Sequence, residues 1–327
     1  MNDQLEAAYK EAARMLREAP KVALACHVNP DPDAIGSMLG LAQHLRERGT
    51  EVVGSWGNDP FTKPRFVQAL PAADLIVAPK EFPAEPELLV TLDTASADRL
   101  ATLQPILDTA KAVIVVDHHV TNPGFGSVNL IDGKASSTAE MVLRLIRAMG
   151  GTVSADSAAC LYAGIVTDTG RFQYEATTPE TLRLAADLRT AGFDHAALAR
   201  ALFEDNSLGF LRALGTALDR VTLDEEAGLV WTYLTQEDLA RTGIPMGETD
   251  DLIDVIRTVR EADAAAVIKQ QRDGTWKVSL RSKGGHDVGS VAAAFGGGGH
   301  RLAAGYTSSE TLEGTAEKLL AALRPGT

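Results

Sequence analysis

The sequence predicts an α/β protein with two domains: an N-terminal, mostly parallel sheet with helices on both faces, and a smaller C-terminal α/β domain. The active site is expected in the cleft between them. Apolar runs and amphipathic segments alternate through the first part of the chain, which is the pattern of β-α-β units. Three of these runs end in aspartate or histidine. The pattern later restarts with hairpin-forming runs, so we expect domains at 1–190 and 222–327, joined by a helical linker at 191–221.

The N-terminal domain is expected to open with an amphipathic helix that Pro20 ends, followed by a short apolar strand that ends at Cys26. The run Ala112-Val-Ile-Val-Val116 is almost continuously β-branched, which is typical of a strand covered on both faces. The Gly-, Pro- and Asn-rich stretch 121–134 is expected to be a loop. The expected strands are 21–26, 51–55, 74–77, 88–92 and 112–116, and the expected helices are 2–19, 34–48, 96–110, 136–149, 155–166 and 178–190.

The linker has a helical pattern that is interrupted near Asp205-Asn206. In the C-terminal domain, Asp273-Gly274 lies between two alternating runs and predicts a hairpin turn. The run Gly296 to Gly299 is expected to be a loop. The expected C-terminal strands are 229–234, 264–270 and 275–280, and the expected helices are 250–261, 287–295 and 312–323.

Composition and charge narrow the class of protein. The hydrophobic fraction of 45% over 327 residues allows a core to form without disulfides, and the two cysteines, Cys26 and Cys160, are expected to be buried free thiols. We expect a cytoplasmic protein without a membrane segment, because the N-terminus is polar and no apolar run is long enough to span a bilayer. The net charge of −13 argues against a long nucleic-acid footprint, which needs a basic groove. A short nucleotide held by metal ions remains open.

Metal-capable side chains follow three of the predicted strands. They are His27, Asp31 and Asp33 after the first, Asp93 after 88–92, and His118 after 112–116. The carboxyl ends of parallel strands lie at one edge of a sheet, so these side chains should converge. Asp168, at the end of the helix 155–166, is a further candidate. An aspartate at 31 or 33 could also simply cap the next helix, which would explain one carboxylate but neither His27 nor the pair.

Six candidate ligands are more than one metal ion needs, and they suit a site that holds two ions. Two cations held by carboxylates suit hydrolysis at phosphorus, because they bind phosphate oxygens and activate water. Asp93 is alone on its strand end and is the candidate bridge between the two ions. Mixed imidazole and carboxylate ligands favour Mn²⁺, with Co²⁺, Zn²⁺ and Mg²⁺ also open.

The residues beside the ligand His118 are expected to act in catalysis together with Asp93 and His118 itself. We expect Asp117 to accept a hydrogen bond from His118 and so fix the orientation of that imidazole. His119 is then expected to protonate the leaving oxygen or to contact the substrate phosphate. His44 and His195 are expected on solvent-exposed helix faces.

A second group of polar residues surrounds the glycine run of the C-terminal domain. Glycines can bring backbone N–H groups against an anion, although a glycine run alone is common in turns. Here basic and polar residues accompany the run, which indicates a second phosphate site. The candidate substrate-binding residues are Arg281, Ser282, Gly297, Gly298, Gly299, His300 and Arg301, with Lys283 nearby.

The motifs taken together resemble those of the DHH phosphoesterase superfamily. The resemblance lies in four ordered elements: His27-x-x-x-Asp31-x-Asp33-x-x-Gly36-Ser37, Asp93, Asp117-His118-His119 and Asp168. Gly297-Gly-Gly-His300 resembles the signature of the DHH-associated C-terminal domain. The resemblance covers nearly the whole chain, and within the superfamily it points to the NrnA-type nano-RNases and pAp phosphatases.

The resemblance implies which ligands hold which ion. One metal would be held by His27, Asp31 and Asp93, and the other by Asp33, Asp93, His118 and Asp168. It implies two Mn²⁺ ions between the domains, with the nucleotide held by the C-terminal domain. The implied activity is hydrolysis of short RNA or DNA oligonucleotides to mononucleotides, and conversion of 3′-phosphoadenosine 5′-phosphate (pAp) to AMP.

Several alternatives remain at this point. Cyclic di-AMP phosphodiesterases resemble this chain in size and in both domains, and are the main alternative. Family II pyrophosphatases have a different C-terminal domain, and RecJ-type exonucleases are longer. A nucleotide sensor without catalysis is a different class of function, which the complete ligand set opposes. A homodimer formed through the helical linker is also open.

Overall fold

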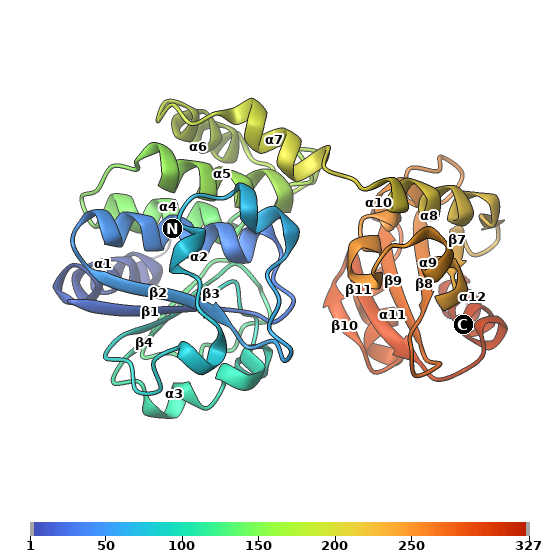
Figure 1. The fold of residues 1–327 in the computed structure, drawn as a ribbon, viewed down its shortest axis with the longest axis horizontal. Helices are drawn as coiled ribbons and strands as arrows, with labels where there is room; N and C mark the ends of the chain where they lie inside the picture. The colour runs from blue at the N-terminus through green and yellow to red at the C-terminus, as the bar shows by residue number, and fades with distance from the viewer. Residues whose placement is uncertain (1–2, 325–327) are drawn as a thin grey trace. The chain divides into compact units, whose positions relative to one another are not determined.

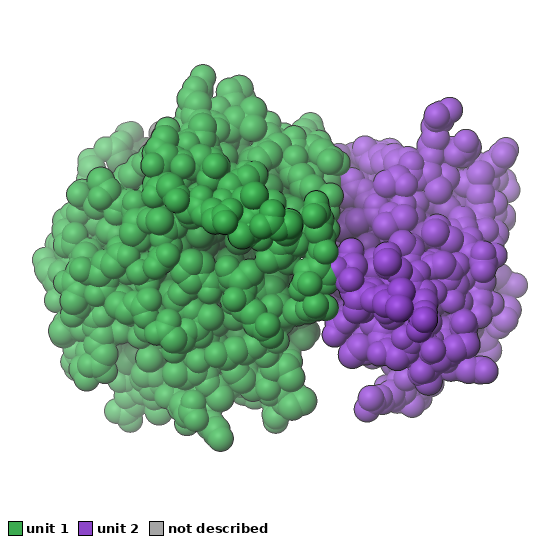
Figure 2. All heavy atoms as spheres, turned by 45° about the horizontal axis from the view of Figure 1, so that its top comes forward, with its two compact units in different colours: residues 1–205 green, residues 206–327 purple. Residues whose placement is uncertain are grey.

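The computed structural model describes residues 3–324, except for the side chain of His300. The chain forms two compact units, which divide after Asp205 (Figures 1 and 2). The predicted linker contains helices α7 (His195–Phe203) and α8 (Leu208–Asp219), and each of them belongs to a different unit. The predicted helix start at Asn2 lies outside the described residues.

The first unit contains a five-stranded sheet in the order β2-β1-β3-β4-β5, in which every neighbouring pair is parallel. This confirms the predicted parallel architecture. The strands are β1 (Lys21–Cys26), β2 (Glu51–Trp56), β3 (Leu89–Leu92), β4 (Val113–Asp117) and β5 (Val128–Ile131). The main helices are α1 (Asp3–Glu18), α2 (Pro32–Glu47), α4 (Thr138–Ala148), α5 (Ala155–Asp168) and α6 (Pro179–Arg189).

Both faces of this sheet are covered, as the β-branched strand pattern predicted. Successive residues of a strand point to opposite faces, and β1 follows this rule. Leu24 and Cys26 pack in the core that includes α2, α4 and α5, whereas Ala23 and Ala25 pack in a second core on the other face. The short helix α3 (Ile106–Thr109) lies on that other side of the sheet (Figure 1).

The secondary structure of the first unit differs from the prediction at three places. Residues 74–77 form no strand but a 3₁₀ turn with a single bridge from Ile76 to β2. Residues 96–110 are not one helix: they form η4 (Ala97–Leu103), with Ala101 in the left-handed region at φ 46°, and then α3. A proline inside a helix clashes with the carbonyl group of the residue four positions earlier, which for Pro105 is Ala101, the position of the break. Strand β5 lies in the predicted loop, because its short sequence at a sheet edge lacks a distinctive pattern.

The second unit is a six-stranded mixed sheet in the order β10-β11-β9-β8-β7-β6, in which only the pair β7–β8 is parallel. Its strands are β6 (Thr222–Asp224), β7 (Leu229–Leu234), β8 (Ala264–Gln270), β9 (Trp276–Ser282), β10 (Gly298–His300) and β11 (Ala303–Ser308). Its helices after α8 are α9 (Gln236–Thr242), α10 (Leu252–Ile256), α11 (Val288–Ala294) and α12 (Leu312–Leu323). Strands β6 and β11 and helix α9 were not predicted, and the expected helix 250–261 is much shorter.

The glycine run was predicted to be a loop, but its second half, from Gly298, belongs to the edge strand β10. Strand β10 pairs with β11, and Gly299 lies opposite Ala304. A Cβ atom on Gly297 would lie 2.2 Å from the carbonyl oxygen of Gly305, and one on Gly299 would lie 2.5 Å from that of Ala303. Glycine is therefore needed here for close packing between strands, which a sequence pattern cannot distinguish from a flexible turn.

Helices α2 and α5 pack closely enough to require glycine between them. A Cβ atom on Gly36 would lie 2.4 Å from the carbonyl oxygen of Cys160. The α2 helix also carries His44, which was expected to face solvent but is only 4% exposed and lies against Gly151. Burial lowers the pKa of His44, so its imidazole is held in the neutral form. None of the helices within residues 3–324 is long and apolar enough to cross a membrane.

Candidate metal centre

All six predicted metal ligands meet at the carboxyl edge of the five-stranded sheet. They come from the ends of β1, β3 and β4, the start of α2 and the last residue of α5. Together with His119, these residues form three groups in which all ligand atoms lie within 4.8 Å of one another. These groups are His27–Asp31–Asp93, Asp33–His118–Asp168 and Asp93–His118–His119.

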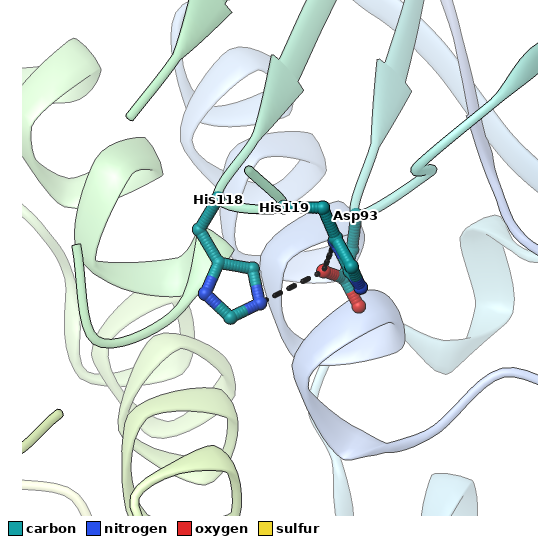
Figure 3. Close-up of side chains that lie close together, drawn as sticks. All are labelled: Asp93, His118 and His119. Atoms are coloured by element: carbon teal, nitrogen blue, oxygen red, sulfur yellow. Dashed lines mark ion pairs between the residues drawn. The ribbon is translucent and has the colours of Figure 1, made fainter. Parts of the chain in front are cut away.

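Asp93 lies at the centre of this arrangement. Its Oδ2 atom is 3.5 Å from His27 Nε2, and its Oδ1 atom is 3.6 Å from His118 Nε2. Figure 3 shows His118 and His119 directed toward the Asp93 carboxylate. Asp93 is buried and has a φ angle of 52°, in the left-handed region that non-glycine residues adopt at a cost of about 1–3 kcal/mol. The fold therefore maintains a strained backbone that presents one carboxylate to both histidines.

Asp31 is both a helix cap and a member of the first group. Its Oδ1 atom accepts hydrogen bonds from the backbone N–H groups of Asp33 and Ala34, at 3.0 and 2.9 Å. Its Oδ2 atom lies 3.9 Å from His27 Nε2. Asp31 can therefore be a helix cap and a metal ligand at once, because Oδ1 accepts the capping hydrogen bonds while Oδ2 faces His27.

The second group is anchored by the N-terminus of α4. Asp33 accepts hydrogen bonds from the backbone N–H groups of Thr138 and Ala139, at 2.7 and 3.0 Å, which helix N-termini offer to carboxylates. Its ligand partners are His118 and Asp168, whose Nε2 and Oδ2 atoms lie 3.5 Å apart. The hydroxyl group of Thr138 donates to Asp93 Oδ1 at 3.0 Å, so one helix start orients carboxylates of both groups.

The hydrogen-bond partner of Asp117 differs from the prediction. Its Oδ1 atom accepts a hydrogen bond from His119 Nδ1 at 2.6 Å, and its Oδ2 atom accepts one from Asn122 at 2.6 Å. His118 instead has a backbone hydrogen bond with Ala135. Asp117 therefore orients His119 rather than His118. The role of Asn122 was missed, because this residue lies in a stretch that the sequence predicted only as a loop.

The electrostatics of the centre indicate that it is built for cations. Burial and the nearby charge of Asp93 raise the pKa values of Asp33 and Asp168 well above their ordinary value. Burial alone would lower the pKa of His27, but its hydrogen bond with Asp93 and the charge of Asp31 raise that pKa to about 9. Buried carboxylates that repel one another and imidazoles that retain a proton are both relieved by a bound divalent cation. The donor set therefore fits metal ions.

These pKa shifts predict how stability depends on pH and metal. The raised pKa of His27, about 9 against an ordinary 6.5, stabilises the metal-free fold below the ordinary value, and this stabilisation is lost as pH rises through about 9. The raised pKa values of Asp33 and Asp168 likewise make the metal-free fold less stable as the pH rises. The lowered pKa of Asp93 has the opposite sign but matters only in acid.

The metal-free protein should therefore melt at a lower temperature at about pH 9 than at about pH 6, by about 5 °C. Added Mn²⁺ should raise the melting temperature most at the higher pH, because it binds the deprotonated ligands. Thermal unfolding of EDTA-treated and Mn²⁺-loaded protein at both pH values checks this. A metal-free melting temperature that stays constant or rises with pH would contradict it.

The predicted substrate-binding residues of the second unit lie near one another in its sheet. The register places Arg281 of β9 and His300 of β10 level, on either side of Ala303. Arg281 is partly buried and donates a hydrogen bond to the carbonyl oxygen of Leu280 at 3.0 Å. The Arg301 guanidinium donates to the carbonyl oxygen of Gly284 at 2.9 Å.

Ser282 and Lys283 form hydrogen bonds within the second unit that the sequence did not predict. Ser282 is buried, and its hydroxyl donates to Asp263 at 3.0 Å. The Lys283 ammonium donates to the carbonyl oxygen of Ala262 at 2.8 Å. Asp263 also accepts from His286 Nδ1 at 2.8 Å, so these groups stabilise the turn after β9. Direct contact of Ser282 with substrate stays a prediction.

Comparison with protein families matches both units separately. The description "DHH family, N-terminal domain" matches residues 21–165, and "DHHA1 domain" matches residues 227–324. The matched ranges contain all the predicted ligands except Asp168, which lies just beyond the end of the first range at residue 165.

Three known proteins are similar over most of this chain. The bifunctional oligoribonuclease and PAP phosphatase NrnA of Thermus thermophilus is 36% identical over 98% of this chain and 95% of its own length. The cyclic-di-AMP phosphodiesterase GdpP of Geobacillus thermodenitrificans is 28% identical over 94% of this chain but only 47% of its own length. Among solved structures, an exopolyphosphatase-related protein from Bacteroides fragilis has a TM-score of 0.91 and 26% identity, covering 97% of this chain and 96% of that one.

Proposed function

The chain belongs to the DHH family, with a DHH domain followed by a DHHA1 domain, and on this basis we propose that it is a metal-dependent phosphoesterase of the NrnA type. Its substrates would be short RNA or DNA oligonucleotides, hydrolysed to mononucleotides, and pAp, dephosphorylated to AMP. The observation that carries the proposal is the position of Asp93 between His27 and His118, with further carboxylates on each side. The relative that is named an oligoribonuclease and PAP phosphatase aligns over 95% of its own length. The cyclic-di-AMP phosphodiesterase aligns over only 47% of its own length.

The proposal assigns two divalent cations to the centre, with Mn²⁺ as the first choice and Co²⁺, Mg²⁺ or Zn²⁺ as alternatives. His27, Asp31 and Asp93 would hold one ion, and Asp33, Asp93, His118 and Asp168 the other. Bound there, the ions would neutralise phosphate oxygens and lower the pKa of a water molecule. The protein's own task is to hold these six side chains in place, and the hydrogen bonds from Thr138 and Ala139 do this for Asp33 and Asp93.

His119 is the proposed general acid. Its Nδ1 atom is committed to the hydrogen bond with Asp117, which orients the imidazole, so the proton for the leaving oxygen would come from Nε2. Asn122 supports this pair by donating to the other oxygen of Asp117. The Asp117–His119 pair thus supplies acid catalysis without using a metal ligand.

The second unit would bind a phosphate other than the one that is cleaved. Arg281, Arg301, His300 and the backbone of Gly297, Gly298 and Gly299 are the proposed binding groups, with Ser282 supporting the turn beside them. Few such contacts suit a short substrate, and the net charge of −13 discourages a long one. The proposal includes a cytoplasmic location, where the buried thiols of Cys26 and Cys160 stay reduced, and a homodimer stays a prediction.

A substrate panel tests this function. Purified protein with Mn²⁺ is expected to hydrolyse pAp, a dinucleotide and a five-residue RNA rapidly, with little activity on a long RNA or on cyclic di-AMP. The release of AMP and mononucleotides is followed by chromatography. A clear preference for cyclic di-AMP would replace the proposal by the second-messenger phosphodiesterase. Absence of turnover on every member of the panel would favour a nucleotide sensor.

A further inference from the structure

Arg99 lies beside the candidate metal centre but was not among the predicted site residues. It belongs to η4, which follows the strand that ends at Asp93. Its backbone carbonyl accepts a hydrogen bond from the N–H group of Val28 at 2.9 Å, so η4 is tied to the turn that carries His27. Its guanidinium Nη2 atom lies 3.1 Å from His27 Nδ1. The fold thus places a cation at the side of the His27–Asp31–Asp93 group.

The contact between Arg99 and His27 is incompatible with the use of His27 as a ligand through Nε2. His27 Nδ1 also lies 2.8 Å from the carbonyl oxygen of Val28. One ring nitrogen cannot accept a hydrogen bond from an arginine and donate one to a carbonyl at the same time. A neutral histidine that ligates through Nε2 carries its proton on Nδ1, which then donates to Val28. In that state the guanidinium of Arg99 has no acceptor on the imidazole.

The charge of the centre gives this guanidinium a different partner. No carboxylate forms an ion pair with Arg99 among residues 3–324, although the centre beside it is rich in acids. The four ligand carboxylates, Asp31, Asp33, Asp93 and Asp168, carry four negative charges, which two divalent cations would balance. An anionic phosphate that enters such a neutral centre needs further positive charge. Arg99 is exposed and placed to supply it.

We propose that Arg99 binds a phosphate oxygen of the substrate at the His27 side of the centre. This inference rests on the proposed function, since it assumes a phosphoester substrate. A planar guanidinium suits the recognition of phosphate, because it can donate two parallel hydrogen bonds to two oxygens. Arg99 would therefore act in substrate binding, and the hydrogen bond of η4 to Val28 would hold it in position.

The test compares Arg99→Met and Arg99→Lys with a matched control, Arg183→Met. Arg183 is an exposed arginine of α6 whose ion pair is with Glu180. Binding of AMP and of adenosine to the Mn²⁺-loaded full-length protein is measured by calorimetry, and so is binding of Mn²⁺ alone. Arg99→Met should weaken AMP binding by about tenfold or more, and Arg99→Lys by less, because lysine keeps the charge but not the fork. Adenosine binding, Mn²⁺ affinity and the Arg183→Met control should change by less than about twofold.

Two outcomes would overturn the inference. Unchanged AMP affinity in Arg99→Met would show that the guanidinium does not contact phosphate. A large loss of Mn²⁺ affinity in both Arg99 variants would make Arg99 a positioning residue for His27 instead. If Arg99→Met does not fold, Arg99→Lys still decides, since only a phosphate contact lowers AMP affinity while leaving Mn²⁺ affinity unchanged. Failure of the proposed function is seen separately, as absent turnover by the wild-type protein on the substrate panel.

Discussion

Replacing Asp93 by asparagine is expected to reduce hydrolysis of every substrate by about a thousandfold or more. Among residues 3–324, Asp93 is the one carboxylate that lies within 3.6 Å of both His27 and His118. Its loss should therefore disturb both proposed metal sites at once, whereas loss of Asp31 or Asp168 would disturb one. The measurement is kcat for pAp and for a dinucleotide, together with the metal content of the purified variant.

Asparagine is the informative substitution because of the backbone at this position. The φ angle of 52° is tolerated better by asparagine than by most other residues, so the variant should keep its fold. The amide oxygen can still accept the hydrogen bond from Thr138. Asp98→Asn, on the exposed part of the following η4 segment, is the matched control and should retain its activity. Substantial metal-dependent turnover by Asp93→Asn, or by Asp93→Ala, would refute the bridging assignment.

The convergence of the metal ligands could be predicted from the sequence because it follows from topology. Once strands and helices alternate in a parallel sheet, the ends of β1, β3 and β4 must share one edge. His27, Asp93 and His118 therefore had to come close together, whatever the details of the loops. The burial of β4 on both faces was also predicted, but from composition, because the strand is almost continuously β-branched.

Details that depend on single backbone turns could not be predicted in this way. The partner of Asp117 is decided by how the chain turns between His118 and His119, and adjacent histidines give no sign of which one faces the carboxylate. The approach of Arg99 to His27 depends on a break in the helical pattern at Ala101 and on a hydrogen bond to Val28. Such contacts join residues that are far apart in the sequence and carry no periodic signal.

The glycines of the α2–α5 interface show how closely the packing of the fold is coupled to the centre. A Cβ atom on Gly164 of α5 would lie 2.6 Å from Oδ1 of Asp33 and 2.7 Å from the Cβ atom of Ala139. The same substitution at Gly40 of α2 would bring a Cβ atom to 2.5 Å from Leu161 Cδ2, at the flexible end of a side chain away from the ligands. The two positions therefore form a matched pair, in which overpacking reaches a ligand in one case only.

Both Gly164→Ala and Gly40→Ala should lower the free energy of unfolding by about 1–3 kcal/mol through overpacking. Only Gly164→Ala is expected to weaken Mn²⁺ binding and turnover, by about tenfold to a hundredfold, because it displaces Asp33 from the N–H groups of Thr138 and Ala139 that hold it. Denaturant unfolding of the metal-free variants measures the change in the free energy of unfolding. Calorimetry measures the Mn²⁺ affinity separately. Equal losses of Mn²⁺ affinity in the two variants would mean that general destabilisation, rather than displacement of Asp33, limits the centre. If Gly164→Ala loses stability but keeps its Mn²⁺ affinity, Asp33 does not bind the second ion, and that metal site must be assigned to other residues.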